Sequence, residues 1–290
     1  MQANCRHRYP EWMARQSGCI AGFRLALAGL LALAVAGCDK DKFPKTSRAD
    51  AHLSDLLQHR YLNDRTMPDG LRVIPPPPGP GSPAMLSDER ARQKALTDHG
   101  TARYLLAVAD ADRSQDATNK AFQCSLGTTI DGSNTPALYS LLAKLRLDVR
   151  ASTYPAKNHY KRPRPYVAEG GSPCATTEAL VRDDGSYPSA RGAVGWAYAL
   201  VLSEIEPQRQ TLIMKRGREF GQSRVICDAE WQSDVDAGRQ LGAAVVDQLR
   251  KVPKFRSDLA AARQEVAKSI ASGLKTPADC AREARALASR

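Results

Sequence analysis

Apolar residues from Leu86 to the C-terminus recur at intervals of three and four, and the alternation typical of strands is nearly absent. This spacing gives each segment one apolar helix face, which must pack against another helix to be buried. The pattern predicts helices over residues 101–111, 135–149, 191–205, 223–252, 254–274 and 277–289. We therefore expect an all-α protein with a single helical-bundle domain.

The N-terminal 37 residues have the features of a signal peptide. Four arginines precede an uncharged apolar run over residues 25–36, which is too short to span a bilayer. Cys38 directly follows small residues, and this arrangement resembles the bacterial lipoprotein signal, in which the cysteine is acylated. We expect a signal peptide over 1–37, lipidation at Cys38, and an exported, periplasmic protein anchored to a cell-envelope membrane. An ordinary secretory signal cleaved near Gly37 is the alternative.

Residues 38–83 differ in composition from the remainder of the chain. They mix charged and short apolar pieces and end in a run that contains six prolines between residues 75 and 83. Such a run favours an extended, stiff segment over a helix or a strand. We expect a tether and proline-rich segment over 38–83, followed by a helical domain over 84–290.

The chain is basic, with a formal net charge of +11. This charge suits nucleic acid, an anionic membrane surface or small anions. Export and the absence of a nucleic-acid motif argue against nucleic acid, so the expected partners are phosphate or small phosphoesters and, through the lipid anchor, a membrane. The sequence leaves a homo-oligomer open.

Four cysteines follow the proposed anchor, at positions 124, 174, 227 and 280. In an oxidising compartment they suggest two disulfides, with three pairings open. Free buried cysteines are the alternative. No two of them have the close spacing of a zinc site. We expect no metal and no cofactor.

Two cations in the irregular stretch 151–190 have a spacing suited to an oxyanion. Lys157 and Arg164 are separated by six residues, and Pro163 and Pro165 stiffen the connecting segment. An arginine can bind two oxygens of a tetrahedral anion, and a lysine adds a point charge. We expect Lys157 to lie in a loop, although a lysine- and arginine-rich loop is often simply solvated.

Two later segments carry further candidates. Ser189 and Ala190 come directly before an apolar helix, where backbone N–H groups favour anions. Arg224 lies at the expected start of the next long helix, with Glu230 and Asp234 one turn apart. Each feature also has an ordinary structural interpretation, because serine is a common helix cap and spaced carboxylates commonly face water.

In order and spacing, these three segments resemble the signature of the bacterial class A non-specific acid phosphatases, within the type 2 phosphatidic acid phosphatase and vanadium haloperoxidase superfamily. The resemblance covers about residues 70–250 and implies an all-helical bundle with the site at one end. It implies that Asp234 orients the nucleophile, and that phosphate is bound by Lys157, Arg164, Ser189, Ala190 and Arg224.

The chain departs from that signature at two positions. Arg191 stands where the family has the histidine that acts as general acid, and Glu230 where it has the histidine nucleophile; no histidine follows His159. Arginine does not release a proton near neutral pH, and a carboxylate repels a phosphate dianion. Without that histidine we also expect no covalent binding of vanadate. We expect a phosphate-binding pseudoenzyme with hydrolysis lost or crippled.

Two alternatives stay open. The chain could be an active acid phosphatase that uses Glu230 as nucleophile and His159 as proton donor, or a purely structural or partner-binding envelope protein. The substitutions also predict a contact. Because the two family histidines face each other, we expect Arg191 and Glu230 to form a salt bridge, and Asp234 to pair with another nearby cation.

Overall fold

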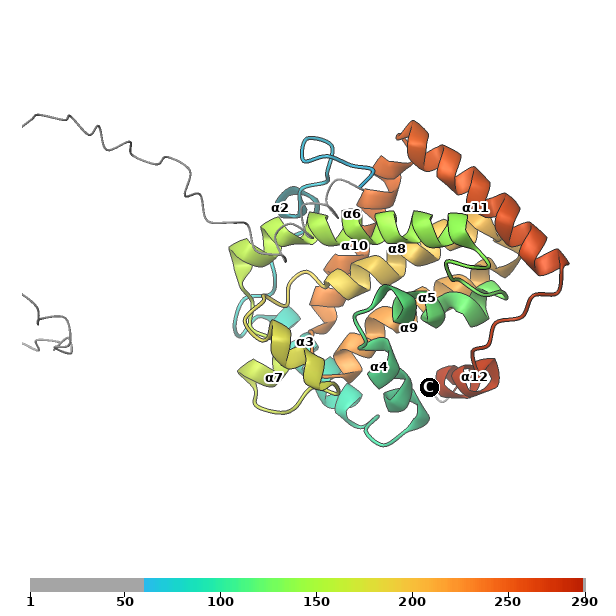
Figure 1. The fold of residues 1–290 in the computed structure, drawn as a ribbon. Helices are drawn as coiled ribbons and strands as arrows, with labels where there is room; N and C mark the ends of the chain where they lie inside the picture. The colour runs from blue at the N-terminus through green and yellow to red at the C-terminus, as the bar shows by residue number, and fades with distance from the viewer. Residues whose placement is uncertain (1–59, 289–290) are drawn as a thin grey trace, which may run out of the picture. The chain divides into compact units, whose positions relative to one another are not determined.

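The computed structural model describes residues 60–288, and all of the regular structure within this range is helical (Figure 1). The expected all-α fold is confirmed. The expected signal peptide, Cys38 and residues 39–59 lie outside the described residues. Within 60–288, no helix is long and apolar enough to cross a membrane. The helices are α2 (Gly70–Val73), α3 (Pro83–Leu96), α4 (Ala102–Asp110), α5 (Gln115–Leu126), α6 (Pro136–Tyr160), α7 (Pro165–Ala168), α8 (Ala190–Ile205), α9 (Gln210–Ile226), α10 (Gln232–Leu249), α11 (Pro253–Ala271) and α12 (Cys280–Ala288). Two short 3₁₀ helices, η1 (Thr176–Val181) and η2 (Pro207–Arg209), lie on either side of α8 in the sequence.

Helix α8 is the centre of the bundle and packs against α6, α9 and α10 (Figure 1). Helix α10 comes unusually close to it. A Cβ added at Gly238 would lie 2.4 Å from the Ser189 carbonyl oxygen, and one at Gly242 would lie 2.5 Å from that of Ala193. Only glycine permits this approach, and it fixes the N-terminal end of α8, from which Ser189 and Arg191 project.

Helix α6 is longer than the sequence predicts. It continues through Pro155 to Tyr160, so Lys157 lies on a helix rather than in a loop. A proline inside a helix removes one backbone hydrogen bond and commonly ends the helix. Here burial of Ala156 and Lys157 holds the last turns in place, and the helix ends where Lys161 adopts a left-handed conformation.

The single helix expected over 223–252 is two helices. Arg224 lies in the last turn of α9, not at the start of a helix, and α10 begins at Gln232. The Arg224 carbonyl accepts the N–H groups of Ala229 and Glu230, which turns the chain. Asp234 then accepts the Trp231 N–H at 2.8 Å and caps α10.

Part of the expected tether packs against the bundle. Leu62 is only 3% exposed, and the N–H groups of Tyr61 and Leu62 donate to Asp148 of α6 at 3.0 and 3.1 Å. Farther along, the Tyr187 hydroxyl donates to the Pro75 carbonyl. Tyr61, Leu62 and Pro75 therefore contact the helical domain, which the sequence predicts to begin at residue 84.

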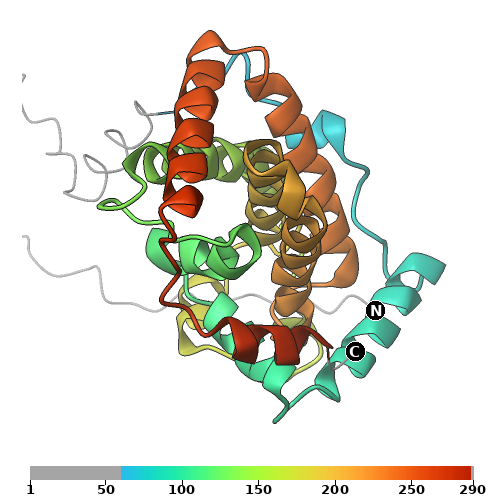
Figure 2. The same ribbon diagram turned by 90° about the vertical axis from the view of Figure 1, so that its right-hand side faces the viewer.

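The four cysteines form two disulfides, as expected. Cys124 pairs with Cys280 and joins α5 to the start of α12, which lies beside α4 (Figure 2). Cys174 pairs with Cys227 and joins the segment after α7 to the end of α9. The second bond holds the segment that contains η1 next to the helix that carries Arg224.

The substitution Leu62→Ala tests whether residues 60–83 belong to the domain. We expect it to lower the free energy of unfolding by about 2–5 kcal/mol, because a buried leucine leaves a cavity. Leu71→Ala, at a position 39% exposed, is the matched control and should cost less. Urea denaturation measures both. Equal, small effects would mean that this segment contributes little to stability.

Candidate active site

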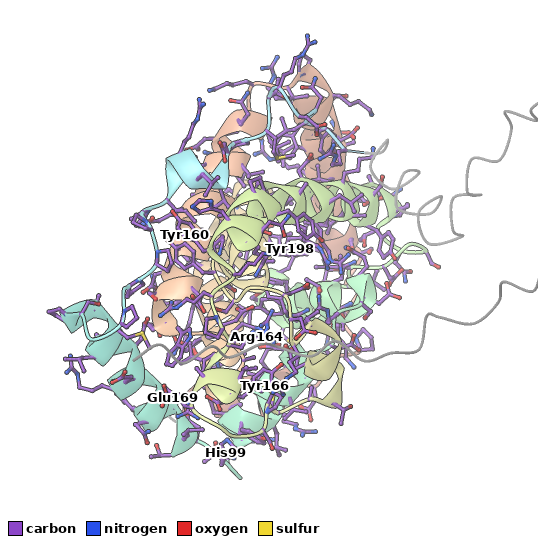
Figure 3. All side chains as sticks on the ribbon, turned by 90° about the vertical axis from the view of Figure 1, so that its left-hand side faces the viewer. His99, Tyr160, Arg164, Tyr166, Glu169 and Tyr198 are labelled. Carbon is purple, nitrogen blue, oxygen red and sulfur yellow. A yellow bond between two sulfur atoms is a disulfide. The ribbon has the colours of Figure 1, made fainter. Side chains whose placement is uncertain are left out.

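The three motif segments meet at the end of the bundle where α6 stops and α7 begins. Figure 3 views this end, with Arg164 between Tyr160 above and Tyr166 below. A cavity of about 40 Å³ lies here. Its walls include six of the eight predicted site residues, namely Lys157, Arg164, Ala190, Arg191, Arg224 and Glu230.

Lys157 reaches the cavity wall from the last turns of α6. Its Nζ donates to the carbonyl oxygens of Gly185 and Ser186 at 2.6 and 3.3 Å. Burial lowers the pKa of Lys157 to about 8, although the nearby Glu230 carboxylate acts in the opposite direction. Its ammonium group is thus already held by the loop that leads to α8.

Arg224 is neutralised by a carboxylate that the motifs do not contain. Its two terminal nitrogens donate to both oxygens of Glu178, in η1, at 2.7 and 2.8 Å. Burial disfavours the charged form of Glu178, but Arg224 and then Arg164 outweigh it and lower the pKa of Glu178 to about 2. The pair is almost fully buried.

Glu230 lies between the two motif arginines. Its Oε1 is 3.5 Å from Arg164 and its Oε2 is 3.4 Å from Arg224. Burial raises the pKa of Glu230, but Arg224, Arg164 and Lys157 outweigh this and the net pKa is below its ordinary value. The carboxylate is therefore ionised and already paired with the cations that a phosphate would need.

Arg191 does not pair with Glu230, so the predicted salt bridge is wrong. The Arg191 guanidinium donates to the Asp110 carbonyl at the end of α4 and lies 5.0 Å from the centre of the Phe220 ring. Burial and then repulsion from Arg224 lower the pKa of Arg191 to about 9. Ser189 caps α8, because its Oγ accepts the Gly192 N–H at 2.7 Å.

Asp234 pairs with a nearby cation, as expected. Its Oδ1 accepts a hydrogen bond from Arg162 at 2.6 Å, and Arg162 also donates to Asp88 at 2.8 Å. Burial raises the pKa of Asp234 to about 6, with Arg162 acting in the opposite direction. Asp234 thus links α10 to α3 through Arg162.

Sequence reasoning missed Glu178 and Arg162. Neither lies at a signature position, and only the fold brings each beside its partner. His159, the proton donor considered above, is exposed, stacks edge-on against Tyr160 and does not line the cavity. In the part of the chain that the structure describes, no group of three or more His, Cys, Asp or Glu side chains could hold a metal ion.

Comparison with known proteins agrees with this geometry. A family model described as PAP2 superfamily matches residues 136–256. A non-specific acid phosphatase of Providencia stuartii is 40% identical over 210 residues, which cover 72% of this chain and 85% of that protein. The chain belongs to the non-specific acid phosphatase family. A non-specific acid phosphatase of Salmonella typhimurium is 42% identical over 195 residues (67% of this chain, 78% of that protein), and an acid phosphatase of Zymomonas mobilis is 33% identical over 212 residues (73% and 80%).

The Glu178–Arg224 pair gives a pH-dependent contribution to stability. The folded pKa of about 2 lies below the ordinary 4.5, so the contribution is fully present above pH 4.5 and is lost as the pH falls through 2. By 1.36 kcal/mol per pKa unit it amounts to about 3 kcal/mol. Denaturation of the natural protein and Glu178→Gln across this range should show the difference shrinking on acidification.

Glu204→Gln is the control for that measurement. Glu204 pairs with Arg250 at a more exposed position, so its removal should cost about 1 kcal/mol or less. A difference between the natural protein and Glu178→Gln that does not change with pH would show that the Glu178 carboxylate has no depressed pKa.

Proposed function

We propose that this chain is an envelope lipoprotein of the acid phosphatase family that binds phosphate or phosphomonoesters, with hydrolysis lost or crippled. The observation that carries the proposal is the pairing of Glu230 with Arg164 and Arg224. In the motif resemblance, Glu230 aligns with the family's histidine nucleophile. A charged, ion-paired carboxylate at that position supports loss of attack on phosphorus.

The proton donor is affected as well. Arg191 aligns with the family's general acid, and its pKa of about 9 keeps it protonated across acid and neutral pH. A general acid works best when its pKa is close to the operating pH. The Arg191 guanidinium also donates to the Asp110 carbonyl, which directs it away from a leaving group. Since His159 does not line the cavity, no described histidine can replace it.

The charge around the cavity supports anion binding. Six cations line it, against two carboxylates, Asp184 and Glu230. A pocket lined with an excess of one sign raises the local concentration of the opposite ion. The lipid anchor and periplasmic location rest on the features of residues 1–38, and acylation of Cys38 would keep the protein at a membrane.

The decisive experiment compares aryl phosphate hydrolysis by the chain from Asp39 with that by a restored triple variant. The variant carries Ala190→Gly, Arg191→His and Glu230→His. General acid–base catalysis contributes roughly 10²–10⁴-fold, so we expect the variant to exceed the natural protein by about 100-fold or more. Hydrolysis is measured from acid to neutral pH.

The substitution Glu230→Gln tests whether Glu230 is itself a nucleophile. If the natural protein turns over and Glu230→Gln abolishes this activity, the chain is an active acid phosphatase with a carboxylate nucleophile, and the proposal is wrong. Lys254→Gln, which changes one exposed charge on α11, is the control for nonspecific effects.

A further inference from the structure

A second cavity of about 40 Å³ adjoins the motif cavity. Four arginines line it, and we call them the arginine cluster: Arg113, Arg146, Arg150 and Arg191. The two cavities share Arg113, Arg150, Arg191 and Ala190 as a common wall. Arg146 lines only the second cavity, on the side away from the motif residues. None of the cluster apart from Arg191 belongs to a signature position.

The cluster brings together three elements of the bundle. Arg146 and Arg150 are one turn apart on α6, on the face that continues to Lys157. At about 1.5 Å per residue, Arg150 and Lys157 are separated by about 10 Å along the helix. Arg113 comes from the connection between α4 and α5, and Arg191 from the first turn of α8.

The members of the cluster form no close ion pairs, unlike the motif arginines. Among residues 60–288, no carboxylate forms an ion pair with any of its four members, whereas Arg164 and Arg224 are paired with Glu178 and Glu230. Two like charges one turn apart on a helix destabilise it. Burial, and then repulsion from Arg150, lower the pKa of Arg113 and of Arg146. The exposed Asp112 nearby accepts a hydrogen bond from the Ser114 N–H.

The cluster also retains hydrogen-bond donors that have no acceptor. The Arg191 Nε is buried and has no partner in the described structure. Arg146 donates through one nitrogen to the Arg113 carbonyl, and no side chain among residues 60–288 accepts a hydrogen bond from Arg113 or Arg150. The first turn of α8 lies at the shared wall and adds positive potential. A cavity of this volume admits about three water molecules, which suits a compact oxyanion.

We propose that the arginine cluster is an oxyanion subsite that binds a phosphoryl group, from free phosphate or from a phosphomonoester, beside the motif pocket. The assignment of phosphate as the anion rests on the proposed function. An anion held against Arg146 lies in the second cavity, which neither Glu230 nor Asp234 lines, so it is bound without being presented for attack. The cluster then binds the phosphoryl group, because the motif arginines are already paired with Glu178 and Glu230.

The test is calorimetric titration of the full mature protein with inorganic phosphate and, separately, with glycerol 3-phosphate. In Arg146→Gln/Arg150→Gln we expect the affinity to fall by about tenfold or more, because two charge-assisted contacts are lost. Tighter binding of glycerol 3-phosphate than of phosphate assigns the site to esters, and the reverse order assigns it to the free ion. Whichever ligand binds more tightly, the proposal requires that its affinity fall in Arg146→Gln/Arg150→Gln.

Thermal unfolding without ligand gives an independent result. Glutamine is a good helix former, and the variant relieves repulsion, so its melting temperature should equal or exceed that of the natural protein. A purely structural role for Arg146 and Arg150 would instead lower it. The matched control, Arg65→Gln/Arg72→Gln, makes the same charge change at exposed positions and should leave affinity within about threefold.

Lys157→Gln separates this inference from the proposed function. If phosphate binds at the cluster, Lys157→Gln lowers the affinity less than Arg146→Gln/Arg150→Gln does, because Lys157 lines only the adjoining motif cavity. If Lys157→Gln weakens binding and the cluster variant does not, phosphate occupies the motif pocket; the inference is then wrong while the proposed function stands. If the natural protein binds neither anion, the inference and the proposed binding both fail, and the restored triple variant still decides the question of hydrolysis.

Discussion

The buried pair between Arg224 and Glu178 is the interaction on which the rest of the site depends. Arg224 ends α9, Glu178 lies in η1, and the Cys174–Cys227 disulfide holds these two segments together. Burying either charge alone would cost several kcal/mol, so each requires the other. Glu178 accepts hydrogen bonds from both terminal nitrogens of Arg224, so only the Arg224 Nε faces Glu230. The two motif arginines are therefore paired with carboxylates before any ligand arrives.

This charge balance gives the motif cations a role in stability that does not depend on a ligand. In a pocket with three buried cations, an anion must be present for stability, whether it comes from a ligand or from the protein. Here Glu178 and Glu230 supply it. Replacing Arg224 would remove both of its hydrogen bonds to the buried Glu178 carboxylate, and replacing Arg164 would remove one of the two cations beside Glu230. Both arginines therefore contribute to the stability of the fold. Their retention alone is therefore weak support for phosphate binding, and the unpaired arginine cluster is stronger support.

Periodicity and motif order predicted the helices and the meeting of the three segments, because both depend on local spacing. The sequence-based predictions are wrong where contacts between distant segments determine where a helix ends. Burial of Ala156 and Lys157 carries α6 past Pro155, and hydrogen bonds to the Arg224 carbonyl break the expected helix at 227–231. The partners Glu178 and Arg162 have no local signal, since they meet Arg224 and Asp234 only in the folded bundle. The pairing of the four cysteines likewise has no local signal in the sequence, since the paired cysteines meet only in the folded bundle.

The position of Arg191 follows from the same competition between partners. Glu230 is already paired with two arginines, so a third cation would gain little from it and would be repelled by Arg224. The Asp110 carbonyl at the C-terminal end of α4 offers an alternative, because a helix C-terminus favours a positive charge. Arg191 therefore donates to the Asp110 carbonyl, and its guanidinium lies over the Phe220 ring. Arg191 thereby becomes part of the arginine cluster, which extends the line of cations from the motif cavity along α6 to Arg146.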